Sequence, residues 1–171
     1  QRALSVYRRH APVSDGMAVN LNSLGNLDRY RGDLEAAETH YREALALHRR
    51  VLGEDHPYIA TDMHNLGRLL ETRGHPAAAE SLLLGSLAVL DKIYPGAHAD
   101  KALTLSSVAE FYLNQQKPAK ADSLAHAGLA MTIQLYGEDS DETRRAKTVV
   151  GELYQRSGRL ELANWIASPG H

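Results

Sequence analysis

Residues 21–57 read LNSLGNLDRYRGDLEAAETHYREALALHRRVLGEDHP, and this stretch decides the fold. Apolar residues lie at helical spacing before and after Gly32 and Asp33. A glycine can end a helix in the left-handed conformation, and an aspartate directly after it can cap the next helix. The stretch therefore predicts two consecutive helices with a tight turn between them.

The same pattern recurs through the chain with a period of 42 residues. A regular spacing of this length indicates a repeat array, in which each unit packs against the next. Small residues at matched positions let paired helices approach closely, because a side chain larger than alanine at position 25, 37, 67 or 79 would push the helices apart. The matched series are Gly25, Gly67, Ala109 and Gly151; Gly32, Gly74, Gln116 and Gly158; Ala37, Ala79, Ala121 and Ala163; and Ala44, Ser86, Gly128 and Gly170.

Each unit contains two apolar helical stripes with a helix breaker between them. Pro76 and Pro118 stand 42 residues apart at predicted helix starts, where the missing N–H of proline costs nothing. No segment shows the alternation of a strand, so the predicted fold class is all-α, built from antiparallel helix pairs. The predicted helices span about 17–31, 33–52, 57–73, 76–93, 100–116, 118–136, 140–157 and 159–167.

The composition excludes several classes of protein. With 43% apolar and 23% charged residues among 171, the chain can bury a core and is not intrinsically disordered. Its 19 Lys and Arg residues against 21 Asp and Glu residues give a net charge of −2, so we expect no nucleic-acid or membrane partner. The absence of cysteine excludes disulfides and thiol chemistry, and it suits the cytoplasmic location that we expect.

Neither a catalytic nor a metal-binding motif is present in the sequence. The nine histidines form no HxxxH or HExxH pattern, and His56 and His98, 42 residues apart, are predicted to be turn or capping residues. No GxSxG elbow and no glycine-rich phosphate loop occurs. We therefore expect no enzyme activity, no metal and no cofactor.

The chain resembles the tetratricopeptide repeat family at these landmarks. The residues that carry the resemblance are LNSLGNL at 21–27, GDLEAAE at 32–38, YREAL at 41–45 and LGEDHP at 52–57. The 42-residue unit is similar to the kinesin-light-chain type, and it is longer than the usual repeat of about 34 residues. The resemblance spans residues 17 to about 167 and implies a right-handed α-solenoid, which is a superhelix of antiparallel helix pairs.

Residues 1–171 are expected to form one array. Residues 1–10 align 42 positions behind residues 43–52, so they are predicted to be the tail of a repeat whose first helix is missing. Because the chain begins inside a repeat and without Met, we expect a fragment of a larger protein, which by resemblance is a bacterial signalling protein. The further repeats are predicted at 17–57, 58–99, 100–140 and 141–167, and the last of them also serves as the C-terminal cap.

The resemblance implies a peptide-binding site on the concave face, which the first helix of each pair lines in this family. Amide side chains offer donors and acceptors to the backbone of an extended peptide, and arginines can bind acidic side chains. A merely solvated polar face is the alternative interpretation. The candidate residues are Asn22, Asn26, Arg29, His64, Asn65, Arg68, Ser106 and Glu110.

The charges along this face are predicted to be separated. Arg29 and Arg68 are expected at one end, and Glu110 and Glu152 at the other, so a ligand should bind in a preferred direction. The clamp for a terminal carboxylate that some family members carry is not expected, because Glu110 would repel such a group.

Asp28 departs from the repeat pattern, because it occupies the position held by Leu70, Tyr112 and Tyr154 in the later repeats. The end of an array meets solvent, so we interpret this residue as a concession to capping. A functional role in binding a partner is the alternative.

The predicted function is that of a protein–protein interaction scaffold, which binds a peptide or protein segment in the concave groove. Two alternatives remain open. The chain could self-associate through the repeat ends, at the incomplete N-terminal repeat and at Trp165. It could also serve as a regulatory module of a multidomain enzyme such as a protein kinase.

Overall fold

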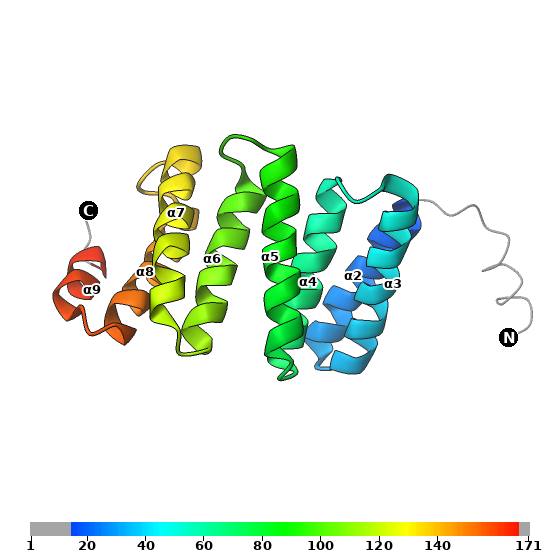
Figure 1. Ribbon diagram of the computed structural model, residues 1–171, viewed down its shortest axis with the longest axis horizontal. Helices are drawn as coiled ribbons and strands as arrows, with labels where there is room; N and C mark the ends of the chain where they lie inside the picture. Colours follow the sequence, from blue (N-terminus) through cyan, green and yellow to red (C-terminus); the bar gives the residue numbers. More distant parts are fainter. Residues whose placement is uncertain (1–14, 168–171) are drawn as a thin grey trace, which may run out of the picture.

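The computed structural model describes residues 15–167, and these residues form eight helices and no strand (Figure 1). The helices follow one another with short turns between them. Every predicted helix is confirmed, with each end within two residues of the expected position. The helices are α2 (Asp15–Arg31), α3 (Leu34–Leu52), α4 (Pro57–Thr72), α5 (Pro76–Ile93), α6 (Ala99–Asn114), α7 (Pro118–Tyr136), α8 (Asp141–Arg156) and α9 (Leu160–Ala167).

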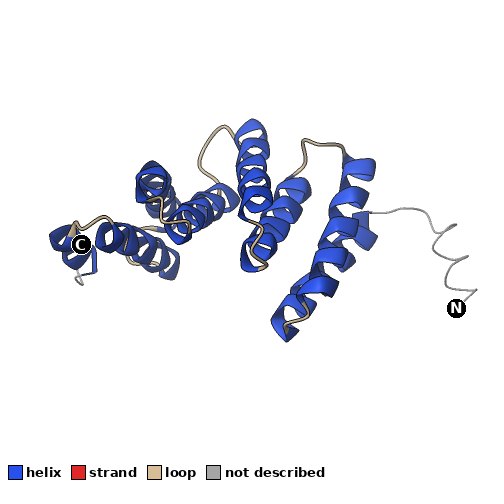
Figure 2. Ribbon diagram, turned by 60° about the horizontal axis from the view of Figure 1, so that its bottom comes forward, coloured by secondary structure: helices blue, strands red, loops and turns tan. Residues whose placement is uncertain are grey.

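Antiparallel helix pairs stand side by side in a curved row (Figures 1 and 2). The pairs are α2 with α3, α4 with α5, α6 with α7, and α8 with α9. The first helices of successive pairs also meet directly, since α6 contacts both α4 and α8. These first helices therefore form the inner, concave side of the array. None of the described helices combines the length and the apolar character needed to cross a bilayer.

The turns inside the pairs use the left-handed conformation at the matched position, as predicted. Gly32, Gly74 and Gly158 have φ angles of 83°, 78° and 76°. Gln116 adopts φ 57° at the same position, so the conformation is kept where glycine is absent. Asp33 caps the following helix, because its side chain accepts a hydrogen bond from the Ala36 N–H at 3.1 Å.

Small residues allow the close approach of the two helices in a pair. A Cβ atom added to Gly25 would lie 2.7 Å from the Tyr41 ring, and one added to Gly67 would lie 2.9 Å from Cγ of Leu83. Both distances are shorter than a carbon–carbon contact tolerates. Gly151 is different, because its added Cβ would stay 3.6 Å from Ile166, which is an ordinary contact.

Among residues 15–167, none covers an apolar surface on α2 at the N-terminal end of the described array. Met17, Leu24 and Leu27 on α2 are 39%, 44% and 41% exposed. We call these three residues the α2 end face. Their counterparts 42 residues later are covered by the preceding helix pair and are fully buried; these counterparts are Ile59, Leu66 and Leu69.

The close approach generates a prediction at two glycines of the same series. Replacing Gly67 by alanine should lower the free energy of unfolding by about 1–3 kcal/mol, because the new methyl group overlaps the buried Leu83. Replacing Gly151 by alanine should raise it by about 0.5–1 kcal/mol, because helix propensity improves where there is room. Urea unfolding followed by circular dichroism measures both values. Equal effects at the two positions would contradict the close-approach argument.

Candidate functional site

The predicted site residues all lie on the first helices of the pairs. Three lie on α2, three on α4 and two on α6, and Arg29 is the one that stands apart, exposed beside the Tyr41 hydroxyl. The others gather along the inner side of the array. They are Asn22 and Asn26 on α2; His64, Asn65 and Arg68 on α4; and Ser106 and Glu110 on α6.

Most of these side chains contact one another across successive helix pairs. Asn65 donates from Nδ2 to Oδ1 of Asn22 at 3.1 Å, and Nε2 of His64 lies 3.0 Å from Oγ of Ser107. Each pair of partners is separated by 42 or 43 residues, which is one repeat. We call this set the inner ladder; its rungs are Asn22 with Asn65, His64 with Ser107, Arg68 with Glu110, and Glu71 with Asn114.

The predicted separation of charge along the face is wrong for Arg68 and Glu110. Nη1 of Arg68 lies 2.6 Å from Oε2 of Glu110, so the two charges form an ion pair. The reason is geometric: residues one repeat apart occupy the same height on neighbouring helices, so they lie opposite each other. Their charges therefore offset each other locally instead of marking two ends of a groove.

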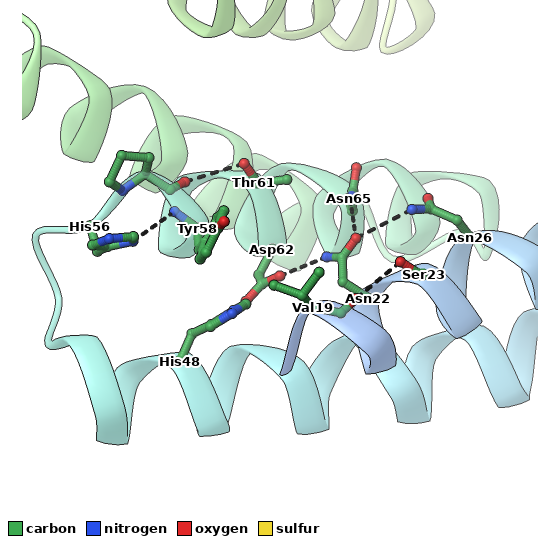
Figure 3. A network of polar contacts seen from close by, with 11 residues as sticks. Val19, Asn22, Ser23, Asn26, His48, His56, Tyr58, Thr61, Asp62 and Asn65 are labelled. Atoms are coloured by element: carbon green, nitrogen blue, oxygen red, sulfur yellow. Dashed lines mark hydrogen bonds and ion pairs between the residues drawn. The ribbon is translucent and has the colours of Figure 1, made fainter. Parts of the chain in front are cut away.

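A buried polar network lies beneath the first rung of the inner ladder (Figure 3). Asp62 on α4 accepts from Nδ2 of Asn22 on α2 at 2.6 Å, and its other oxygen lies 2.6 Å from Nδ1 of His48 on α3. Both His48 and Asp62 are only 1% exposed. Burial raises the pKa of Asp62, while the contacts with His48 and Asn22 oppose that rise. One carboxyl group thus joins three helices.

Asn22 connects this buried network to the concave surface. Its Oδ1 accepts from Asn65 and also from Nδ2 of Asn26 at 3.2 Å, while its Nδ2 donates to Asp62 (Figure 3). An amide is suited to this position because it presents both a donor and an acceptor. The residue is therefore a structural connector between the first two repeats.

The pairing of His48 with Asp62 was not predicted from the sequence. A signal existed, since these two ionisable residues stand where the next repeat has Leu90 and Thr104. Neither repeat taken alone shows that the two side chains meet, because His48 ends one helix pair and Asp62 begins the next.

Asp28 has a partner within its own helix pair. Its carboxylate lies 2.7 Å from Nδ1 of His40, and both side chains are partly buried. The interpretation of Asp28 as a concession to solvent at the end of the array is therefore wrong. The tyrosines at the matched positions are also partnered, since Tyr112 donates to Glu80 and the Tyr154 hydroxyl contacts His126, both at 2.8 Å.

A second ladder, which was not predicted, lies near the starts of the second helices of the pairs. Its acidic members, Glu38, Glu80 and Asp122, are spaced by 42 residues. Each one forms an ion pair with a base of the following helix pair. Burial alone would raise the pKa of Glu38, but Arg42 and Arg73 outweigh it and lower the pKa. The bases are Arg73, Lys120 and Arg159.

His56 and His98 are helix caps, as predicted. The Nδ1 atom of each ring accepts a hydrogen bond at 3.2 Å, from the N–H of Tyr58 and of Asp100 respectively. Both rings therefore contribute to folding. Within residues 15–167, no cluster of three side chains suited to hold a metal ion is found.

The concave side opens into a cavity of about 350 Å³ between α6 and α8. The floor is apolar and is formed by Ala102, Leu103, Ala146 and Val149. Two predicted site residues, Ser106 and Glu110, line it, and so does Tyr136 on α7.

The cavity lies where the inner ladder ends. One repeat beyond Ser107 stands Val149, and one repeat beyond Glu110 stands Glu152. A serine opposite a valine, and a glutamate opposite a glutamate, cannot form the rungs seen between α4 and α6. The groove is therefore closed by side-chain contacts between the earlier first helices and is open between α6 and α8.

The connecting role of Asn22 generates a prediction. Replacing Asn22 by alanine removes a hydrogen bond to the buried Asp62 and should lower the free energy of unfolding by about 1–3 kcal/mol. Replacing the adjacent Ser23, which is exposed and bonds only to the Val19 carbonyl of its own helix, should change it by less than about 0.5 kcal/mol. Chemical unfolding compares the two variants. If the Asn22 variant is as stable as the Ser23 variant, Asn22 does not connect the first two repeats in the way proposed.

Comparison with known proteins agrees with this geometry. The family model of the tetratricopeptide repeat matches residues 16–92. A crystal structure of nearly identical TPR-like repeats of a Podosopora anserina putative kinesin light chain (Q17M) is similar with a TM-score of 0.79 and 16% identity, over 96% of this chain and 78% of that one. BtubC (BKLC) from P. vanneervenii is similar with a TM-score of 0.83 and 18% identity, over 97% of this chain and 69% of that one.

No curated protein matches the chain. The solved structures are less than 25% identical to it and therefore establish the fold alone. The predicted family and fold class are confirmed. Residues 16–92 match the tetratricopeptide repeat family, and the chain folds as the right-handed α-solenoid seen in kinesin-light-chain-like repeat proteins.

Proposed function

We propose that the chain is a protein-binding scaffold that holds a peptide or protein segment in its concave groove, at the cavity between α6 and α8. Tetratricopeptide repeats generally mediate protein–protein interaction, which supports the class of function. The observation that carries the location is the cavity of about 350 Å³ at the point where the inner ladder ends. Cavities of a few hundred Å³ with an apolar floor and a few polar groups are typical of binding sites.

The floor of the cavity offers an anchor for an apolar side chain. Leu103 is 59% exposed and Tyr136 is 45% exposed, so both have apolar area that a ligand could bury. The helices that carry them are fixed by packing before any ligand arrives, and a preformed site lowers the ordering cost of binding. Ser106 and Glu110 can then contact the polar atoms of the bound segment.

The remaining predicted site residues do not line the cavity. Asn22, Asn65, His64 and Arg68 are engaged in the inner ladder, so they support binding by fixing the spacing of the first helices. Asn26 and Arg29 are exposed on α2 and stay candidates for direct contact with a longer ligand. We propose no catalytic step and no cofactor. The larger bacterial signalling protein, the protein kinase link and the cytoplasmic location stay predictions.

The test of the proposed function uses peptides selected on the wild-type chain from a displayed random library. Replacing Leu103 by serine should weaken their binding about tenfold, because it removes roughly 1.5 kcal/mol of apolar contact. Replacing Leu160 by serine is the matched control, since Leu160 is 60% exposed and lies outside the cavity. Fluorescence anisotropy measures both, with circular dichroism as a check of folding. Equal effects of the two variants, or a library that yields no binder, would contradict the proposal.

Self-association is a second candidate function, favoured by the α2 end face. Met17, Leu24 and Leu27 are exposed, although the matched residues of the next repeat are buried against a preceding helix pair. Residues 1–10, predicted to be the tail of a further repeat, lie outside the described residues, and the side chain of Trp165 is not described either.

The self-association candidate predicts a dimer that depends on this face. Light scattering of the wild-type chain should show a mass that rises with concentration, and a Leu24→Glu/Leu27→Glu variant should stay monomeric, because it places two charges on the apolar contact. The Leu103→Ser variant is the control and should associate like the wild type. A wild-type chain that is monomeric at all concentrations would remove this candidate.

A further inference from the structure

We propose that the segment bound between α6 and α8 carries two basic side chains, about four or five residues apart, with an apolar side chain between them. The inference rests on the proposed function and specifies the chemistry of its ligand. Three features of the cavity carry it: the apolar floor, the charges on its rim and the spacing of those charges.

The apolar floor defines the middle of the ligand. Leu103 and Val149 lie on facing helices, and Leu103 is the more exposed of the two. A cavity of about 350 Å³ accommodates a large apolar side chain together with the adjoining backbone. An apolar side chain here buries the surface of Leu103 that the free chain leaves in water.

The rim of the cavity is predominantly acidic. The residues that line the cavity include three acids, Asp100, Glu110 and Glu142, and one base, Arg145. Glu142 and Arg145 are exposed and take part in no ion pair among the described residues. Glu110 is paired with Arg68, and Asp100 lies 3.8 Å from Nδ1 of His98, so Glu142 is the lining carboxylate without a basic partner among the described residues. The surplus of carboxylates favours a cationic ligand and disfavours an acidic one.

The acidic residues are placed in two pairs across the interface of α6 and α8. Asp100 and Glu142 are one repeat apart, and so are Glu110 and Glu152. Residues one repeat apart on first helices lie opposite each other, as Arg68 and Glu110 show. At the first level Asp100 and Glu142 both line the cavity. At the second level Glu110 lines the cavity and is paired with Arg68, while Glu152 is exposed, so a basic side chain there would supply to Glu152 the charge that Arg68 supplies to Glu110.

The distance between the two levels of acidic residues along α6 sets the number of residues between the two basic side chains of the ligand. The two levels are separated by ten residues of helix on α6, from Asp100 to Glu110, which corresponds to about 15 Å. An extended chain advances about 3.3 Å per residue, so the two bases stand four to five residues apart. Leu103 and Ser106 lie between the two levels, which places the apolar side chain of the ligand between its bases.

The test determines the amino-acid sequences of peptides that are selected for binding to the wild-type chain from a displayed random library. We expect Lys or Arg to be enriched at two positions four or five residues apart with an apolar residue between them. A Glu142→Lys variant should bind the selected peptides about tenfold more weakly, because it replaces attraction by repulsion at one acidic level. The matched control is Glu43→Lys on α3, which makes the same charge change at an exposed site outside the cavity.

Salt gives an independent readout, since raising the NaCl concentration from about 50 to 500 mM should weaken the binding several-fold. Selected peptides that are acidic or neutral, or a Glu142→Lys effect no larger than that of Glu43→Lys, would overturn the inference. If the Leu103→Ser variant nevertheless binds those same peptides more weakly than the wild type, the proposed function stands and only the inferred chemistry of the ligand is wrong. A library that yields no binder overturns both.

Discussion

The close approach of the two helices within the first two pairs is the constraint on which the rest of the structure depends. Gly25 packs against Tyr41 and Gly67 against Leu83 with no room for a Cβ atom, which favours one height at which the two helices of each of these pairs meet. Because the period of 42 residues repeats this height, matched residues of successive first helices come to lie opposite each other. This alignment brings together the polar side chains that form the inner ladder between α2, α4 and α6. It also sets Ser107 opposite Val149 and Glu110 opposite Glu152, where the inner ladder ends.

The concave side of the array serves two purposes along its length. Between α2 and α6 its polar residues bond to each other, and the buried carboxyl group of Asp62 strengthens the first of these junctions. Between α6 and α8 the matched residues cannot pair, and the side opens into a cavity with an apolar floor. Polar residues at repeat spacing are thus compatible with a structural role in one part of the face and with a role in binding in another.

Local features of the fold were predictable from the sequence. Helix ends, the turn at Gly32 and the caps at Asp33 and His56 depend on residues within one turn of each other. Contacts between repeats were predicted less well. The pairing of His48 with Asp62 was missed, and Arg68 and Glu110 were expected apart, because both outcomes depend on which helix turns face each other across repeats. The candidate residues lie on the first helices of the pairs, as expected, but their bonding pattern was not predicted, and their role in binding stays a prediction.

The ion pair of Arg68 with Glu110 bears on how such a chain could grow during evolution. Repeat arrays can lengthen by copying a unit, and a unit is freely copied only if it fits against itself. A copy of residues 58–99 placed beside the original would set one Arg68 opposite an identical arginine, and His64 would lose its serine partner. Each repeat is therefore complementary to its neighbour and not to itself. The repeats therefore cannot be exchanged for one another, and their order along the sequence is needed for the contacts between them.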